Sequence, residues 1–125
     1  MAHLLIIDDD DLFRPMLREN LEQLGHTVTE ASNGKEGLAQ FARVQADLVL
    51  TDLIMPEKEG IETIIELRKK WPGVKVIAMS GGGRVSASNY LKTAQQLGAA
   101  CVLHKPFSND ELTAAIDSLF PKTKP

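Results

Sequence analysis

Short apolar runs recur along the chain at nearly regular intervals. They lie between 21 and 27 residues apart and begin near Leu4, Thr27, Leu48, Val74 and Cys101. The segments between them carry apolar residues at helical spacing. The clearest such repeat, at i, i+3, i+4 and i+7, consists of Leu112, Ala115, Ile116 and Leu119. Strands that alternate with helices of this length predict βαβ units and a parallel sheet, hence an α/β fold.

The five predicted strands differ in where their polar residues fall. Residues 4–7, 48–50, 76–79 and 101–103 are continuously apolar, which is typical of strands covered on both faces. The segment Thr27–Ala31 alternates between polar and apolar residues instead, so we expect it at an edge of the sheet. Helical spacing of apolar residues predicts five helices, which fall within residues 13–24, 38–42, 61–67, 91–97 and 112–119.

Residues that favour helix ends agree with these boundaries. Gly25 and Gly98 follow the last apolar residues of the first and fourth predicted helices, where a left-handed backbone conformation suits glycine. Residues 108–111 read Ser-Asn-Asp-Glu, which predicts a capping box at the start of the last helix.

Composition limits the classes of protein that the chain can belong to. Its 125 residues, 43% hydrophobic and 25% charged, predict one globular domain over residues 1–120 with a short tail at 121–125. No apolar run approaches the roughly 20 residues of a membrane span. The net charge of −3 disfavours direct binding of nucleic acid. A single cysteine, Cys101, and the absence of a signal-like N-terminus lead us to expect a cytoplasmic protein.

The chemically capable side chains follow the predicted strands. Asp8 and Asp9 follow the first, Asp52 follows the third, Ser80 ends the fourth, and Lys105 follows the fifth. In an open parallel sheet, ligands bind beyond the carboxyl ends of the strands, where the strand order reverses. For strand order 2-1-3-4-5 this point lies between the first and third strands, which carry the acids. We therefore expect the acids to converge there.

Carboxylates brought together in this way repel one another unless a cation compensates them. Oxygen ligands suit Mg²⁺ or Mn²⁺ better than zinc, and Mg²⁺ usually keeps positions for water or phosphate oxygens. A carboxylate can also act as a nucleophile toward phosphorus. Lys105 would then supply a positive charge to the phosphoryl oxygens, and Ser80 would supply a hydroxyl group.

Four segments in this order resemble a known family. They read LIIDDD at residues 5–10, TDLIMP at 51–56, SG at 80–81 and KPF at 105–107. Together they resemble the receiver domains of two-component response regulators, including the chemotaxis response regulator. The resemblance covers almost the whole chain. It implies a flavodoxin-like, doubly wound, five-stranded parallel sheet of order 2-1-3-4-5 with five helices.

The resemblance also implies residue roles. Asp52 would accept the phosphoryl group, and Asp8, Asp9, Asp52 and the backbone carbonyl of Ile54 would hold Mg²⁺. Ser80 would be the switch hydroxyl, Lys105 would contact the phosphoryl group, and the Lys105–Pro106 bond would be cis. The implied partners are a sensor histidine kinase or a histidine phosphotransfer protein, and an output partner that the sequence does not identify. We expect a binding and switching module and not an enzyme.

Two features depart from the best-known pattern of the family. Val102 stands three positions before Lys105, where an aromatic residue often turns inward on activation, and a valine has no ring to turn. Ile54 and Gly82 occupy positions that tune hydrolysis of the phosphoaspartate in the family. Neither side chain can orient a water molecule, so we predict a long-lived phosphorylated state.

Other functions fit parts of the pattern. A small Mg²⁺-dependent phosphatase also uses an aspartate nucleophile, but usually carries a second acid two residues later, where this chain has Ile54. A flavin- or nucleotide-binding domain could share the topology, yet the acid cluster would repel an anionic cofactor. The acids could also have a purely structural role: Asp10 or Asp11 is expected to cap the first helix.

Overall fold

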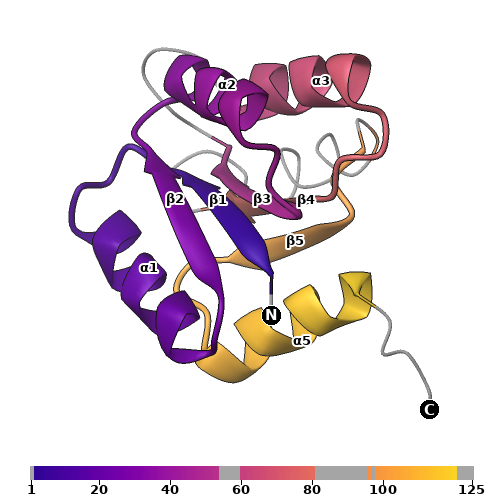
Figure 1. The fold of residues 1–125 in the computed structure, drawn as a ribbon. Coiled ribbons are helices and arrows are strands. Elements are labelled where there is room, and N and C mark those ends of the chain that lie inside the picture. Colours follow the sequence, from indigo (N-terminus) through magenta and orange to yellow (C-terminus); the bar gives the residue numbers. More distant parts are fainter. Residues whose placement is uncertain (1, 54–59, 81–95, 97, 121–125) are drawn as a thin grey trace.

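The computed structural model describes residues 2–53, 60–80, 96 and 98–120. The strands and helices alternate as the sequence predicts (Figure 1). In chain order they are β1 (His3–Ile7), α1 (Phe13–Gln23), β2 (Thr27–Ala31), α2 (Gly34–Arg43), β3 (Leu48–Asp52), α3 (Gly60–Lys70), β4 (Val76–Ser80), β5 (Cys101–His104) and α5 (Asn109–Leu119). Of the predicted fourth helix, at 91–97, only position 96 belongs to the described residues, so this helix remains a prediction.

All neighbouring strands pair in parallel, in the order β2-β1-β3-β4-β5. The predicted strand order is therefore confirmed, and β2 lies at an edge as its alternating pattern indicates. The register pairs Ile7 at the end of β1 with Thr51 in β3. Asp8 and Asp52, the residues that follow this pair, consequently lie side by side at the carboxyl ends of the two strands.

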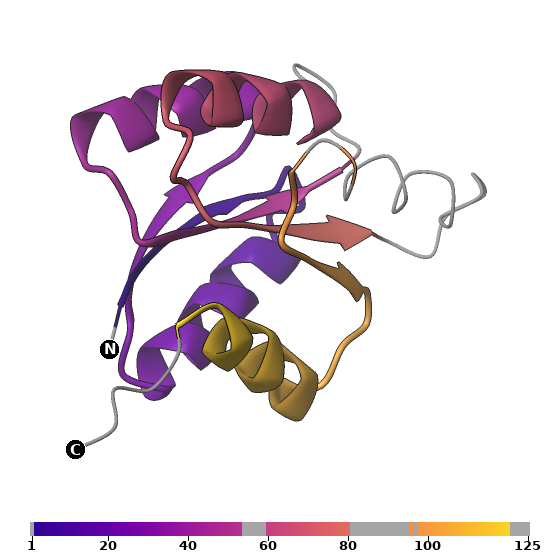
Figure 2. The same cartoon turned by 90° about the vertical axis from the view of Figure 1, so that its right-hand side faces the viewer.

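Helices cover both faces of the sheet (Figures 1 and 2). Successive side chains of a strand point to opposite faces, and this divides the core into two clusters. Leu5, Ile7 and Val49 pack with Phe41 of α2 and Ile64 of α3. On the other face, α1 and α5 pack against the remaining inward side chains of β1 and β3, and that cluster includes Leu4, Ile6, Leu17, Leu21, Leu48, Leu50, Leu112 and Ile116. The continuously apolar strands are thus buried on both faces.

The end of α1 and the start of α5 lie where the sequence predicts them. Gly25 and Gly98 have φ angles of 97° and 116°, a region that favours glycine. Ser108 and Glu111 form the capping box, in which each side chain accepts from the other residue's backbone N–H.

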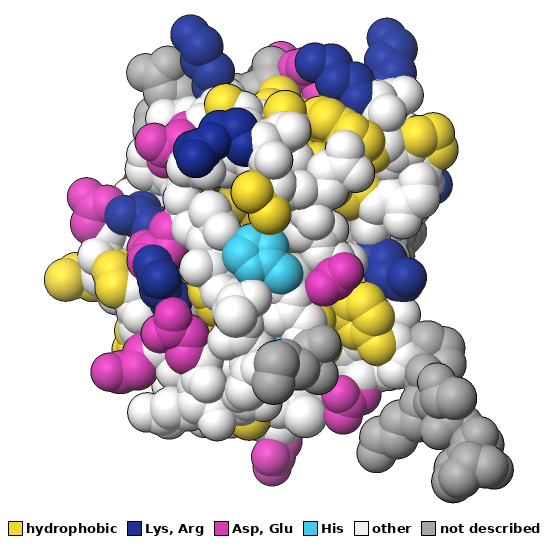
Figure 3. Space-filling model, in the orientation of Figure 1, with side chains coloured by type: hydrophobic (Ala, Val, Ile, Leu, Met, Phe, Trp, Pro, Cys, Tyr) yellow, Lys and Arg dark blue, Asp and Glu magenta, His cyan; other side chains and the backbone are white. Residues whose placement is uncertain are grey.

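Among the described ranges, no helix is long and apolar enough to cross a membrane. Basic and acidic side chains are interspersed on the face shown in Figure 3. That face therefore has no continuous basic stripe of the kind that nucleic-acid binding usually requires.

Candidate functional site

Three acidic side chains meet at the carboxyl end of the two central strands. Asp8 follows β1, and Asp52 is the last residue of neighbouring β3. One carboxylate oxygen from each of Asp8, Asp9 and Asp52 lies within 4.8 Å of the other two. The structure thus brings the three acids together at the point where the strand order reverses.

Burial makes this cluster electrostatically costly. Asp8 is fully buried, and Asp52 has only 9% of its surface exposed, whereas Asp9 is exposed. Loss of solvation raises the pKa of Asp52 to about 7, and the negative charges of Asp8 and Asp9 add to this rise against the opposing charge of Lys105. Such a site favours a bound cation, because a cation allows the carboxylates to remain ionised together.

Lys105 reaches into the cluster from the residue after β5. Its Nζ donates to Oδ2 of Asp8 at 2.6 Å and lies 3.8 Å from Oδ1 of Asp52. The same ammonium group lies 4.2 Å from the centre of the Phe13 ring, which in turn packs edge-on against Phe107. One lysine thus faces two buried carboxylates, so the described part of the cluster retains excess negative charge.

The loop between β1 and α1 fixes Asp8 through several backbone contacts. The Asp8 N–H donates to the Ala31 carbonyl of β2 at 3.0 Å, and its Oδ1 accepts the N–H of Asp10 at 2.9 Å. The Asp10 carboxylate accepts the N–H groups of Phe13 and Leu12 at the start of α1, and these bonds lower its pKa. Asp10 therefore caps the helix as predicted.

Ser80 and Lys105 are brought together by the pairing of β4 with β5. Ser80, the last residue of β4, is paired with His104 and is 5% exposed. Its carbonyl accepts the Lys105 N–H at 2.7 Å, and the Lys105–Pro106 bond is cis. The His104 side chain is exposed. Val102 is partly buried and packs against the core cluster that contains Phe41 and Ile64.

Two residues singled out in the sequence, Ile54 and Gly82, lie outside the described residues. Two expectations therefore remain predictions: that the backbone carbonyl of Ile54 is a metal ligand, and that these two residues slow hydrolysis of the phosphoaspartate.

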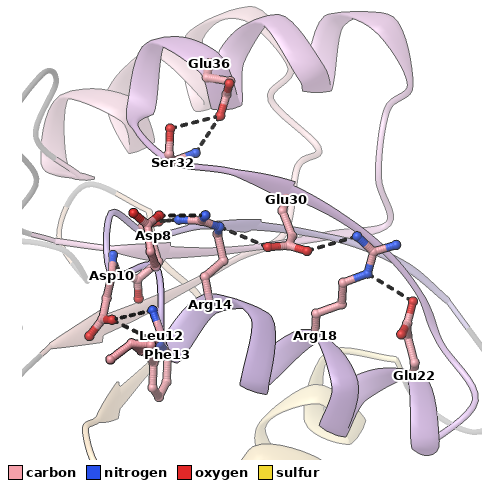
Figure 4. Close-up of polar contacts among 11 residues, drawn as sticks. Asp8, Asp10, Leu12, Phe13, Arg14, Arg18, Glu22, Glu30, Ser32 and Glu36 are labelled. Carbon is pink, nitrogen blue, oxygen red and sulfur yellow. Dashed lines mark hydrogen bonds and ion pairs between the residues drawn. The ribbon is translucent and has the colours of Figure 1, made fainter.

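Sequence reasoning missed two residues that contact the site. The backbone N–H of Gly60 donates to the Leu53 carbonyl at 2.9 Å, and a Cβ atom at Gly60 would collide with the backbone oxygen of Asp52. Arg14 donates to the backbone carbonyl of Asp8 at 2.6 Å (Figure 4). The available signals were a glycine opening α3 and a basic residue one turn after the acid cluster.

Comparison with known proteins agrees with this geometry. Residues 4–117 match the family described as the response regulator receiver domain. A transcriptional regulatory protein of Escherichia coli K12, GlrR, is 36% identical over 99% of this chain and 27% of its own length. The chemotaxis protein CheY of Halobacterium salinarum is 31% identical over 92% of this chain and 93% of its own length. A receiver-domain crystal structure from Clostridium thermocellum has a TM-score of 0.88 at 31% identity and covers 95% of this chain and 94% of that one.

Fold and acid cluster thus define a phosphoacceptor module of the α/β class. The chain belongs to the response regulator receiver domain family. It spans about a quarter of the length of GlrR and nearly all of the archaeal CheY.

Proposed function

We propose that Asp52 accepts a phosphoryl group from the phosphohistidine of a sensor histidine kinase or a histidine phosphotransfer protein. The observation that carries the proposal is the convergence of Asp8, Asp9 and Asp52 within 4.8 Å beside the ammonium group of Lys105. In the transfer, an Asp52 oxygen forms a bond to phosphorus while the bond from phosphorus to the histidine nitrogen breaks. The electron pair of the broken bond returns to the imidazole, and the product is an aspartyl-phosphate.

The donor set fits Mg²⁺ or Mn²⁺. All three side chains offer oxygen, the ligand that these hard cations prefer, and the burial of Asp8 and Asp52 leaves their negative charge poorly solvated. Asp8, Asp9 and Asp52 would hold the ion, together with the Ile54 carbonyl that the family pattern implies. When bound, the ion supplies positive charge that offsets the negative charge of the transferring group.

Each of the remaining groups has a role that follows from its place. Asp52 must be ionised to attack, so its raised pKa of about 7 makes the nearby positive charges essential for activity at neutral pH. Lys105 lies 3.8 Å from Asp52 and would contact a phosphoryl oxygen attached there. Ser80, at the end of the next strand, would donate its hydroxyl to another oxygen and so report phosphorylation to the segment that follows it.

The output would be a change in affinity for a partner protein. Val102 packs on the core and carries no ring that could turn inward. The switch we propose therefore depends on Ser80 and on the charge at Asp52.

Phosphorylation by a small donor tests this proposal without the cognate kinase. Incubation with acetyl phosphate and Mg²⁺ is expected to add one phosphoryl group, seen by intact mass and removed by hydroxylamine. Asp52→Asn should abolish the addition, and Asp110→Asn, which changes an exposed acid in the first turn of α5, should not. Labelling that persists in Asp52→Asn would place the acceptor elsewhere.

A further inference from the structure

The guanidinium group of Arg14 donates a hydrogen bond to the backbone of the acid cluster, at Asp8 (Figure 4). Arg14 lies in the first turn of α1, and three of its nitrogens donate to three different acceptors. One terminal nitrogen bonds the Asp8 carbonyl at 2.6 Å, Nε bonds Glu30 at 3.0 Å, and the other terminal nitrogen bonds Asp11 at 2.9 Å. The planar, rigid guanidinium can satisfy all three only in one orientation.

A second arginine completes the support of Glu30. The other Glu30 oxygen accepts from Arg18 at 2.9 Å, and Arg18 also donates to Glu22 at 3.0 Å. Burial opposes ionisation of Glu30, but its bonds to Arg18 and Arg14 outweigh burial and lower its pKa. Glu30 is therefore a fixed anion on β2 against which the Arg14 side chain is held.

The atom that Arg14 contacts belongs to the link between two acids. The carbonyl of Asp8 and the N–H of Asp9 are parts of one planar peptide unit. The N–H of Asp8 is already held by the Ala31 carbonyl, so the Arg14 bond to the following carbonyl fixes the rotation of the peptide plane between Asp8 and Asp9. That rotation decides how the two side chains are presented to a shared ion.

We propose that Arg14 is a positioning residue for the divalent-cation site, and that Glu30 on β2 orients it. This inference rests on the function proposed above. It makes a prediction opposite in sign to simple electrostatics. A positive charge close to the cluster should repel a divalent cation, so its removal alone would tighten binding, whereas loss of the positioning contact weakens it.

The experiment is a titration with MgCl₂ alone, followed by calorimetry and by the amide resonances of the loop. Arg14→Lys keeps the charge and loses the three-way contact, and Arg14→Gln removes both. Each should weaken Mg²⁺ binding by about tenfold, the usual scale for groups that orient metal ligands. The matched controls, Arg18→Lys and Arg18→Gln, alter the same ion-pair network without touching Asp8 and should stay within about twofold.

Phosphorylation provides a second readout. In the Arg14 variants, the Mg²⁺ concentration for half-maximal labelling by acetyl phosphate should rise by the same factor of about ten. The rate at saturating Mg²⁺ should remain within about twofold of wild type, because Arg14 touches no reacting atom. Glu30→Gln should shift the half-maximal concentration in the same direction by a smaller factor.

Unchanged or tighter Mg²⁺ binding in Arg14→Gln, or equal weakening in the Arg18 variants, would overturn the inference. Failure of the wild-type protein to bind Mg²⁺ would instead refute the metal site of the proposed function. The metal-free protein then still tests Arg14: the Asp9 amide resonance should shift, and its hydrogen exchange accelerate, in Arg14→Lys but not in Arg18→Lys. An Asp9 amide that is unaffected in Arg14→Lys would count against the positioning role.

Discussion

Asp52 and Glu30 are both partly shielded carboxylates near the same end of the sheet, but their pKa values shift in opposite directions. Burial and neighbouring acids raise the pKa of Asp52 to about 7. Glu30 also loses solvation, yet its bonds to two arginines lower its pKa. Burial and ion partners together account for the difference: Asp52 is the more deeply buried carboxylate and shares the ammonium group of Lys105 with Asp8. Glu30 is less buried and has two guanidinium partners.

The contrast separates a structural network from a reactive site. Every charge in the chain of Glu22, Arg18, Glu30 and Arg14 has an opposite charge beside it. Within the described residues, the acid cluster has three carboxylates and one nearby ammonium group. This excess of negative charge destabilises the metal-free protein, and it allows the site to bind a cation, which in turn can hold a phosphoryl group. Residues whose pKa values are strongly perturbed within a cluster of charged groups often mark functional sites.

The pH dependence of stability should show the contrast most strongly at Asp52. Its folded pKa of about 7 lies above the ordinary value of 3.8. The folded state therefore binds the proton more tightly, and the metal-free protein should lose stability as pH rises from 4 to 7. At about 1.4 kcal/mol per unit, the loss is on the order of 4 kcal/mol.

Urea unfolding of the wild type and of Asp52→Asn, in chelator and across this pH range, would measure that effect. The variant should lack the loss and be the more stable protein at pH 8. Addition of Mg²⁺ at pH 8 should stabilise the wild type more than the variant, which keeps Asp8 and Asp9 but lacks the third carboxylate. Parallel pH curves for the two proteins would show that Asp52 is not destabilised in the folded state.

Removal of Lys105 should leave the acid cluster with no neighbouring ammonium group from the described part of the chain. Lys105→Met leaves Asp8 buried without its ammonium partner, so the metal-free free energy of unfolding should fall by about 3 kcal/mol. Mg²⁺ should bind more tightly, because the ion no longer competes with a fixed cation, while phosphorylation at saturating Mg²⁺ should slow by about a hundredfold. Lys70→Met, an exposed position, is the control. Weaker Mg²⁺ binding in Lys105→Met would contradict this electrostatic account.

Gly60 and Gly73 differ in how much space a side chain would find. A Cβ at Gly60 would meet the Asp52 backbone, whereas one at Gly73 would meet nothing within 4 Å. Gly60→Ala should therefore cost about 1–3 kcal/mol and reduce phosphorylation by displacing Asp52, while Gly73→Ala should change stability by less than about 0.5 kcal/mol. Denaturant unfolding and acetyl phosphate labelling of both variants provide the test. Equal stability of the two would mean that α3 moves away from β3 without penalty.

Much of this architecture follows from the sequence, because strand ends are visible as changes from apolar to polar residues. Asp8 and Asp52 could be placed together once the strand order was known, since β1 and β3 then become neighbours. The contact of Arg14 with Asp8 could not be predicted. It depends on how far α1 is rotated about its axis and how closely it approaches β2, and apolar spacing only indicates which face is buried.

The contacts of Gly60 and Glu30 could not be predicted for the same reason, since they too depend on how the helices pack on the sheet. A glycine at a helix start reads as a turn residue, and its approach to Asp52 appears only when α3 is docked on β3. Glu30 reads as one of the polar positions of an alternating edge strand. Nothing in that alternation shows that it faces two arginines from a helix that begins 17 residues earlier in the chain, at Phe13.

Glu30 itself should give the smallest effect and the opposite pH dependence to Asp52. Its folded pKa lies below the ordinary value, so its contribution to stability is present above the unfolded pKa and disappears as pH falls through the folded one. Partial exposure screens its ion pairs, and Glu30→Gln should therefore cost about 1 kcal/mol at pH 7 and almost nothing at pH 2. Urea unfolding at the two pH values, with Glu22→Gln as the more exposed control, measures the difference. A cost for Glu30→Gln that is the same at both pH values would mean that its shape and packing, and not its charge, support the loop that carries Asp8.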